Sequence, residues 1–546
     1  MNLRRRFLIS FAIVCWLSAP AFATEQLNES RHVVIVVWDG MRPDFVSEQN
    51  TPTLCKLVHD GVTFRNHHAL YPSATNVNGT ALVTGVYPGK HGIIANHVYR
   101  PEIDARRTID VEIPAVVKKG DALSGGKYVS APTLTELVPR AGGRTVVASA
   151  KTVGLLLDRN VGHASGLPSA DSASGTHAPS SQDRAKNGIA LFAGKSLPPE
   201  ILASIEEKLG VFPSAHVQRD AWTTKALTEF LWKDGVPPLS ILWLGEPDLT
   251  QHEKAPGSSE ALAAIKSSDQ NLAAVLAALD QRDVRASTNV FVVSDHGFST
   301  IRRSVDLRKI LSDAGFAAKL EFNGEPQPAD IMLAGNGGSV LFYVVGHDEK
   351  LIHRLVEFLQ QSDFASVIFT KNPMDGTFSL DQAKIATDHS PDVVMAFRWN
   401  DSKNQFGIPG MIDADWQRGA GQGTHATLSR FDMHNTLIAA GPDFKRGETD
   451  DLPSGNVDLA PTILQILGIK LPNGMDGRIL SEALVNAGPT EVNLKPEIKT
   501  AEAVKDFASG TWQQSLQISR VGSTVYFDQG NGEFLAKHGT PDTTTR

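Results

Sequence analysis

Cysteine is almost absent from this chain of 546 residues, which has only two, Cys15 and Cys55. Cys15 lies in an N-terminal leader that we expect to be removed, so no intramolecular disulfide is possible afterwards. Cys55 falls in a short helical pattern that Thr51 and Pro52 begin and Gly61 ends. We expect it to be a buried small hydrophobe without thiol chemistry.

Long apolar runs are also scarce. The longest candidate, residues 7–17, is shorter than the roughly 20 residues that span a bilayer. Arg4, Arg5 and Arg6 precede it, and Ala21 and Ala23 follow with the small-x-small spacing of a signal peptidase site. We therefore expect a signal peptide over residues 1–23 and an exported protein, periplasmic or secreted, with no stable membrane anchor.

Positive charge is in deficit, with 52 Lys and Arg against 60 Asp and Glu and a formal net charge of −8. Loss of the three leader arginines would change this to −8 − 3 = −11. Proteins that coat nucleic acids or bind anionic membranes need basic patches, so both roles are disfavoured. The 41% hydrophobic and 21% charged composition is that of a globular protein with a full core.

Buried strand patterns alternate with helical ones over much of the chain. Because such alternation is typical of parallel sheets, we expect an α/β fold with a mostly parallel sheet and helices on both faces. The expected strands are residues 33–38, 62–64, 145–150, 239–244, 289–294, 392–397 and 436–440, and the main helices are residues 133–140, 220–232, 259–280 and 457–467.

Three stretches interrupt this alternation: residues 100–130, 152–215 and 303–388. We interpret them as insertions, with a Ser-, Gly-, Ala- and Pro-rich loop at 163–183 and a strand–helix–strand run within the third, which is suited to cap a site. The chain then divides into the leader, a core domain at 24–485, and a C-terminal extension at 486–546 with a β-hairpin.

Acidic side chains recur where the expected strands end. Asp39 follows VVIVVW, Asp248 follows ILWLGEP, and Asp295 and His296 follow NVFVVS, while Lys151 follows TVVASA. An Asp in such a place often caps a helix, but the carboxyl ends of parallel strands share one edge of a sheet. The recurrence therefore predicts four potential metal ligands that converge, with Lys151 near them.

Further ligands follow from spacing. Asp248 and His252 are four residues apart, which places both on one helical face, and Glu246 and Glu253 are nearby alternatives. The remaining ligand should be a histidine in the late Gly-rich loop, where His425 follows Gly and Thr. His434 is its rival, but it leads into the strand at 436–440 and would lie at that strand's other end.

The stretch YPSATNVN, residues 71–78, supplies the candidate nucleophile Thr75 just before an expected helix. The alternative is a helix cap, a common role of such hydroxyls. No Ser-His-Asp pattern is present, so metal coordination is the plausible way to activate a threonine hydroxyl. Ser73 is the next candidate.

At these motifs the chain resembles the type I phosphodiesterase and nucleotide pyrophosphatase branch of the alkaline phosphatase superfamily. The similar segments are VVIVVWDGMRPD, YPSATNVNGTALVTGVYPGKHGI, LGEPDLTQH, VVSDHG, GTHA and HNTLIAAGPDFK. The resemblance implies an alkaline-phosphatase-like core and two divalent ions, expected to be zinc, although ligand types alone also admit Mn or Mg. It implies Asp39, Thr75, Asp295 and His296 around one ion, Asp248, His252 and His425 around the other, and Asn78 as a donor to phosphoryl oxygens.

These residues predict a two-metal hydrolase of small phosphoesters, a phosphodiesterase or nucleotide pyrophosphatase, that acts through a phosphothreonine on Thr75. Relatives that cleave nucleotides often have Phe-Pro where this chain has Asn76 and Val77, so a nucleotide substrate is not implied. Relatives that hydrolyse monoesters or phosphonoacetate have two cationic residues where this chain has only Lys151. Because a dianionic phosphoryl group needs more positive charge than a diester, the missing second cation favours diesters.

Two alternatives stay open: a phosphomonoesterase or phosphonoacetate-type hydrolase in the same fold, and a silent metal-bearing protein that binds phosphate compounds. A sulfatase is disfavoured, because YPSATNVN lacks the Cys/Ser-x-Pro-x-Arg motif. His67, His68, His91 and His97 lack spaced partners, and we interpret them as packing groups or groups that support the ligands, His91 foremost.

Overall fold

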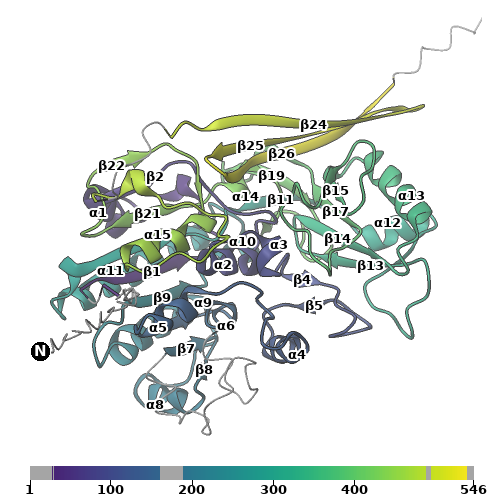
Figure 1. Cartoon of the computed structure of the whole chain (residues 1–546). Coiled ribbons are helices and arrows are strands. Elements are labelled where there is room, and N and C mark those ends of the chain that lie inside the picture. The colour runs from purple at the N-terminus through teal and green to yellow at the C-terminus, as the bar shows by residue number, and fades with distance from the viewer. Residues whose placement is uncertain (1–26, 29, 160–187, 487–493, 538–546) are drawn as a thin grey trace, which may run out of the picture.

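The computed structural model describes residues 27–28, 30–159, 188–486 and 494–537. The expected signal peptide and the loop at 163–183 therefore lie outside the described residues. A nine-stranded sheet forms the centre of the fold (Figure 1). Its strands, in spatial order, are β22 (Glu448–Asp450), β2 (Gly61–Phe64), β21 (Leu437–Ala440), β10 (Thr288–Val293), β1 (His32–Trp38), β9 (Leu239–Leu244), β6 (Thr145–Ser149), β7 (Gly188–Phe192) and β8 (Lys195–Leu197).

The five strands β10, β1, β9, β6 and β7 run parallel, whereas β21 and β8 are antiparallel to their neighbours. The expected α/β class with a mostly parallel sheet is confirmed. The β-branched run of β1 is buried from Val33 to Trp38 because both faces of the sheet are covered.

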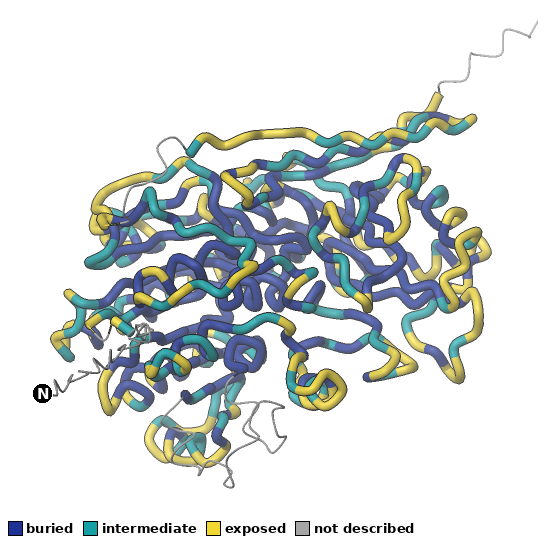
Figure 2. Tube along the Cα trace, viewed as in Figure 1, coloured by how far each residue is buried: buried dark blue, intermediate teal, exposed yellow. Residues whose placement is uncertain are grey.

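Successive residues of β1 pack alternately into two separate apolar cores, one on each face of the sheet. Val33, Ile35 and Val37 pack with α2 (Thr75–Thr84), α5 (Leu134–Arg140), α6 (Gly154–Leu157) and α15 (Leu459–Ile466). Val34, Val36 and Trp38 pack with α1 (Pro52–Asp60), α9 (His216–Lys225) and α11 (Ser259–Asp280). Figure 2 shows the resulting continuous buried centre and an exposed rim of loops and outer helices.

A second, six-stranded sheet lies beside the first. Its order is β12 (Ala317–Lys319), β13 (Asp330–Gly335), β14 (Ser339–Val344), β17 (Val393–Phe397), β15 (Ala365–Thr370) and β16 (Phe378–Ser379). The helices α12 (Leu307–Asp313) and α13 (Glu349–Gln360) share a third apolar core with it. The expectation that residues 392–397 return to the central sheet was wrong, because an apolar run shows that a strand is buried but not in which sheet.

Smaller elements complete the fold. Residues 97–124 form β4 (His97–Val98), β5 (Ile109–Asp110) and α4 (Pro114–Ser124), and residues 200–209 form α8 (Glu200–Leu209). A four-stranded sheet has the order β18 (Trp399–Lys403), β19 (Pro409–Ala414), β11 (Ser299–Ser304) and β20 (Gly423–Thr424). Short β3 (His67–His68) pairs with β23 (Ser454–Gly455).

The C-terminal extension forms a three-stranded antiparallel sheet of β24 (Glu497–Phe507), β25 (Gly510–Val521) and β26 (Thr524–Ala536). These long strands lie across the top of the molecule in Figure 1. Trp512 of β25 is fully buried in the core of the second sheet. No helix among the described residues combines the length and apolarity needed to cross a membrane.

Candidate metal centre

Three neighbouring strands deliver the acidic residues to one place. The ends of β1, β10 and β9 are level, since Val37 pairs with Val293 and Trp38 with Leu244. Asp39 follows β1, Asp295 and His296 follow β10, and Asp248 begins α10 (Asp248–Lys254) shortly after β9. All four side chains are buried. The structure thus brings together the ligands expected from the strand ends.

The turn after Asp39 depends on Gly40. Its φ of +71° is in the left-handed region, and a Cβ there would lie 3.1 Å from the Cβ of Asp248. The Gly40 N–H donates to Asp295 Oδ1 at 3.1 Å. A glycine here therefore lets two strand ends approach closely and fixes the orientation of Asp295.

The first ligand cluster consists of Asp39, Asp295 and His296, with ligand atoms within 4.8 Å of one another. His296 Nε2 lies 3.6 Å from Asp39 Oδ1 and 3.3 Å from Asp295 Oδ2. The hydroxyl Oγ1 of Thr75 is 3.3 Å from the same nitrogen. The candidate nucleophile is thus in contact with this cluster.

The second cluster surrounds Asp248. Its Oδ1 lies 3.2 Å from His252 Nε2 and 3.6 Å from His425 Nε2. The rings of His425 and His296 stack with centroids 3.7 Å apart, so the two clusters are adjacent. All seven expected ligands, Thr75 included, therefore form one continuous centre, in which six are buried and His252 is partly exposed.

The hydrogen bonds of the histidines fit metal binding. In each ring Nδ1 faces a backbone carbonyl, that of Gly297 for His296, Gly423 for His252 and Ser73 for His425. Because Nδ1 must then carry the proton, Nε2 presents a lone pair toward the carboxylates. Burial lowers the pKa of His252 and His425 and keeps them neutral.

The arrangement of the carboxylates is also suited to bind a metal ion. Asp39 Oδ1, Asp248 Oδ1 and Asp295 Oδ2 are buried and accept no hydrogen bond from the residues that the structure describes. Lone pairs of carboxylates and imidazoles cannot stabilise one another without a proton or a metal ion between them. This mixed nitrogen and oxygen donor set fits zinc and related divalent ions.

Lys151 lies against both clusters. Its Nζ is 2.8 Å from Asp39 Oδ2 and 3.0 Å from Asp248 Oδ2. Burial opposes its charge, but Asp248 and Asp39 raise the pKa of Lys151 well above its usual value. Burial and the charge of Asp295 raise the pKa of Asp39, whereas the charge of Lys151 outweighs burial and holds the pKa of Asp248 low.

Thr75 is the first residue of α2, and the cap position belongs to Ala74, whose side chain makes no capping bond. The alternative role of Thr75 as a helix cap is therefore wrong. Its hydroxyl points to His296 instead of closing the helix start. The Asn76 N–H donates to Asn96, and the other free backbone N–H groups of the first turn of α2 are available to an anion.

Asn78, which we expected to donate to phosphoryl oxygens, lies in the protein interior and is not exposed toward the centre. Its Nδ2 donates to the carbonyls of Leu70 and Ala74 at 3.2 and 3.1 Å, and its Oδ1 accepts from Leu70 N and Asn456 Nδ2. The side chain is fully buried. This geometry favours a role in fixing the loop before α2 over a role as a phosphate donor.

The rival residues are engaged elsewhere. The Ser73 hydroxyl donates to the Thr427 carbonyl, and the Glu246 carboxylate accepts from the N–H and hydroxyl of Thr250. Glu253 is exposed, and His434 contacts His68 away from the centre. His91 is buried and its Nδ1 accepts from Ile93 N, so its contacts serve local packing.

Three further residues support the centre and were not singled out from the sequence. Asn96 Oδ1 accepts from the N–H of Asn76, which places the Asn96 amide at the start of α2. Trp243 Nε1 donates to Asp39 Oδ2 at 2.9 Å. Phe298 packs on His252 and His425 with centroids 4.9 and 5.4 Å away. The only sequence signal for such a role was that Asn96 lies shortly after the HGI motif at residues 91–93 and that Phe298 directly follows the SDHG motif at residues 294–297.

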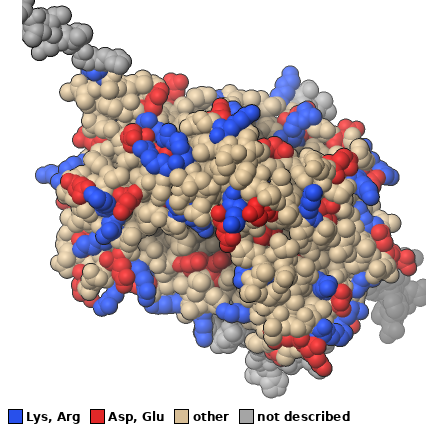
Figure 3. Space-filling view, turned by 180° about the vertical axis from the view of Figure 1, so that it is seen from behind, with Lys and Arg blue, Asp and Glu red and all other residues tan. Residues whose placement is uncertain are grey.

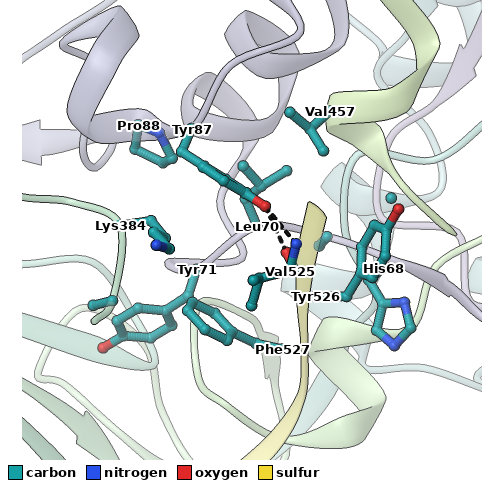
Figure 4. A pocket seen from close by; sticks show the side chains of 13 residues that line it. His68, Leu70, Tyr71, Tyr87, Pro88, Lys384, Val457, Val525, Tyr526 and Phe527 are labelled. Carbon is teal, nitrogen blue, oxygen red and sulfur yellow. Dashed lines mark hydrogen bonds between the residues drawn. The ribbon is translucent and has the colours of Figure 1, made fainter. Parts of the chain in front are cut away.

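A small cavity near α2 is separate from this centre. It is lined by Tyr71, Tyr87, Lys384, Tyr526 and Phe527, among others, and the Tyr87 hydroxyl bonds to the backbone of Val525 (Figure 4). With about 10 Å³ it has room for one water molecule at most. It is too small for a substrate.

The fold and the paired His and Asp clusters define an α/β protein with two adjacent groups of potential metal ligands at the carboxyl ends of its strands. A family model for type I phosphodiesterase / nucleotide pyrophosphatase matches residues 33–400. The chain belongs to this family, as expected from its motifs.

Relatives with curated descriptions are distant. Rat ectonucleotide pyrophosphatase/phosphodiesterase family member 7 is 21% identical over 489 residues, which cover 88% of this chain and 94% of the relative. The venom phosphodiesterase of Macrovipera lebetinus is 22% identical over 86% of this chain and 47% of its own length. Human family member 1 is 22% identical over 55% of this chain and 28% of its own length. The chain thus spans less than half of two of these relatives.

Solved structures share the fold. Human ectonucleotide pyrophosphatase/phosphodiesterase 5 superposes with a TM-score of 0.56 at 16% identity, covering 83% of this chain and all of the other. The murine protein, an inactive threonine-to-alanine variant in complex with AMP, gives 0.53 at 18% identity, with 81% and 96% covered. These similarities establish the architecture.

Proposed function

We propose that this protein is a two-metal phosphodiesterase that transfers the phosphoryl group of a small phosphoester to Thr75 and then to water. The observation that carries the proposal is the set of unpartnered carboxylate oxygens that face imidazole Nε2 atoms beside the Thr75 hydroxyl. A purely structural cluster would pair these atoms with donors from the protein.

Asp39, Asp295, His296 and Thr75 would hold one ion, and Asp248, His252 and His425 the other. When bound, two such ions lower the pKa of an attacking hydroxyl and neutralise charge on the phosphoryl group. We propose zinc as the ion, since the ligands are a mixture of imidazole and carboxylate.

The chain's own groups define where the phosphoryl group sits. The N–H groups at the start of α2 adjoin Thr75, and a helix N-terminus favours an anion. Asn96, held through its oxygen by Asn76 N–H, keeps its amide N–H₂ free to donate there. Lys151 adds positive charge from the side of Asp39 and Asp248. We therefore assign the oxyanion role expected of Asn78 to Asn96.

The substrate class follows from charge. Lys151 is the one cation that the structure places against both clusters among the described residues, which suits the single negative charge of a diester. Arg418 favours the second candidate, a monoesterase, because its charge lowers the pKa of His252 and so lies within electrostatic reach. The related murine structure, with a threonine replaced in its inactive form and AMP bound, supports the nucleophile and a phosphoester ligand.

Export completes the proposal. The leader expected at residues 1–23 would direct the protein to the periplasm or outside the cell. Acidic and basic side chains are interspersed over the face shown in Figure 3, so this face offers no extended basic surface for a nucleic acid. The expected ligand is therefore a small molecule.

The test compares hydrolysis of a bis-aryl phosphate with that of the mono-aryl phosphate on purified protein, with zinc content measured in parallel. We expect faster diester turnover, loss of turnover in Thr75→Ala, and near wild-type turnover in Ser73→Ala, whose hydroxyl serves Thr427. A mono-aryl rate well above the bis-aryl rate would favour the monoesterase. No turnover of either substrate with zinc bound would favour a silent binding protein.

A further inference from the structure

A third group of potential metal ligands lies outside the candidate centre. His68 of β3, His434 at the end of α14 (Arg430–Met433) and Asp528 of β26 have ligand atoms within 4.8 Å of one another. The three residues come from distant parts of the chain, and none belongs to either cluster of the candidate centre. They meet where the C-terminal sheet rests on the core.

The proton positions around His68 point to a cation. Its Nδ1 lies 2.9 Å from the carbonyl of Ser454, so this nitrogen must carry a proton. Its Nε2 lies 3.0 Å from Asp528 Oδ1. A neutral His68 would then point a lone pair at a carboxylate oxygen, which is unfavourable unless a positive charge is shared between them. That charge is either a proton on His68 or a metal ion.

His434 favours the metal ion. Its ring lies 4.5 Å from that of His68, and the two residues form a β-bridge that fixes this approach. The ring of His434 is half-buried, and neither of its nitrogens forms a hydrogen bond with another of the described residues. Burial and the nearby rings of His68 and His67 lower the pKa of His434 and keep it neutral. A neutral imidazole without partners is a ready metal ligand.

The surroundings hold these ligands in place. The Ser519 hydroxyl lies 2.9 and 3.0 Å from the two oxygens of Asp528, and Tyr526 stacks on His68 with centroids 5.6 Å apart. Figure 4 shows His68 and Tyr526 side by side at the edge of the one-water cavity. A ligand carboxylate with its own hydrogen-bond donor and a ligand imidazole bonded to a carbonyl are the usual supports of a protein metal site.

We propose that His68 Nε2, a ring nitrogen of His434 and a carboxylate oxygen of Asp528 bind a third divalent metal ion of the zinc class, which ties β26 to the core. Two imidazoles and one carboxylate are a common zinc set, and water would take the fourth position. Ligands of one tetrahedral zinc ion lie roughly 3.3 Å apart, close to the 3.0 Å between His68 and Asp528.

The test is the number of zinc ions per chain in the whole protein, purified with zinc and dialysed against metal-free buffer. We expect three in the wild type and two in both His434→Phe, which keeps the ring packing, and Asp528→Asn, which keeps the shape of the side chain. His353→Ala removes an exposed histidine of α13 as a matched control and should retain three.

Two results would overturn the proposal. A wild-type count of two that His434→Phe and Asp528→Asn both leave unchanged means that no ion depends on these residues and that His68 and Asp528 are an imidazolium–carboxylate pair. A count of three that His434→Phe leaves unchanged places the extra ion elsewhere. The expected total of three rests on the two ions of the proposed centre, whereas the loss of one ion in His434→Phe and Asp528→Asn is measured without any hydrolysis assay and tests this site separately.

Discussion

Replacing Trp243 by Phe removes one hydrogen bond to the metal centre and little else that is polar. Trp243 Nε1 donates to Asp39 Oδ2 at 2.9 Å from a fully buried position. A hydrogen bond to a charged group contributes about 1.5–3 kcal/mol, and loss of such a support costs a metal site about 10–100-fold in affinity. We expect zinc affinity in Trp243→Phe to fall by this factor.

The matched control is Trp232→Phe. Trp232 is equally buried, and its Nε1 donates to Ser240 Oγ at the same distance of 2.9 Å, away from any ligand. Both variants should lose similar stability, on the order of 1–3 kcal/mol for the smaller ring and the lost bond. Competition with a chelator should show weaker zinc binding only in Trp243→Phe. Equal zinc affinity in the two variants would refute the idea that Trp243 orients Asp39.

Three more predictions follow from the site and its surroundings. Asn96→Ala should lower kcat for a diaryl phosphate by about 10²–10³-fold, as for other lost oxyanion donors, whereas an unchanged kcat would remove Asn96 from the site. Zinc removal by EDTA should lower Tm, and zinc should restore it, because Asp39, Asp295 and Asp248 would otherwise face one another; an unchanged Tm would argue against a metal centre. Burial lowers the pKa of His67 to about 3. The contribution of the neutral His67 ring to the free energy of unfolding is therefore fully present above about pH 6.5 and falls on acidification by up to about 1.4 kcal/mol per pH unit. In EDTA, the free energy of unfolding measured with urea should therefore fall by about 2 kcal/mol less in His67→Gln than in the wild type between about pH 6.5 and pH 5. An equal fall in both proteins would contradict this.

The strand ends could be predicted because burial on both faces leaves a clear pattern. The apolar runs of β1 and β10 stop at Asp39 and Ser294, and the rule that parallel strands share an active edge then places Asp39 beside Asp295. The sheet membership of β17 could not be predicted in this way. Its run from Val393 to Phe397 is as apolar as that of a central strand, and only the pairing with β14 and β15 decides its place.

The choice between two asparagines also needed the structure. Asn78 and Asn96 both lie close to Thr75 in the sequence, and nothing local shows which amide is free. Asn78 is held by Leu70, Ala74 and Asn456, and Asn456 is 378 residues away. Likewise, His68 and Asp528 meet across 460 residues. Contacts at such separations leave no pattern in a single sequence.

The central claim is that Thr75 carries the phosphoryl group, and the most direct measurement is mass spectrometry of the protein after acid quenching during turnover of a diaryl phosphate. We expect a phosphopeptide that contains residues 71–78 with the phosphate on Thr75, and none in Thr75→Ala. Phosphate on Ser73 instead, or steady turnover by Thr75→Ala at the wild-type rate, would contradict it.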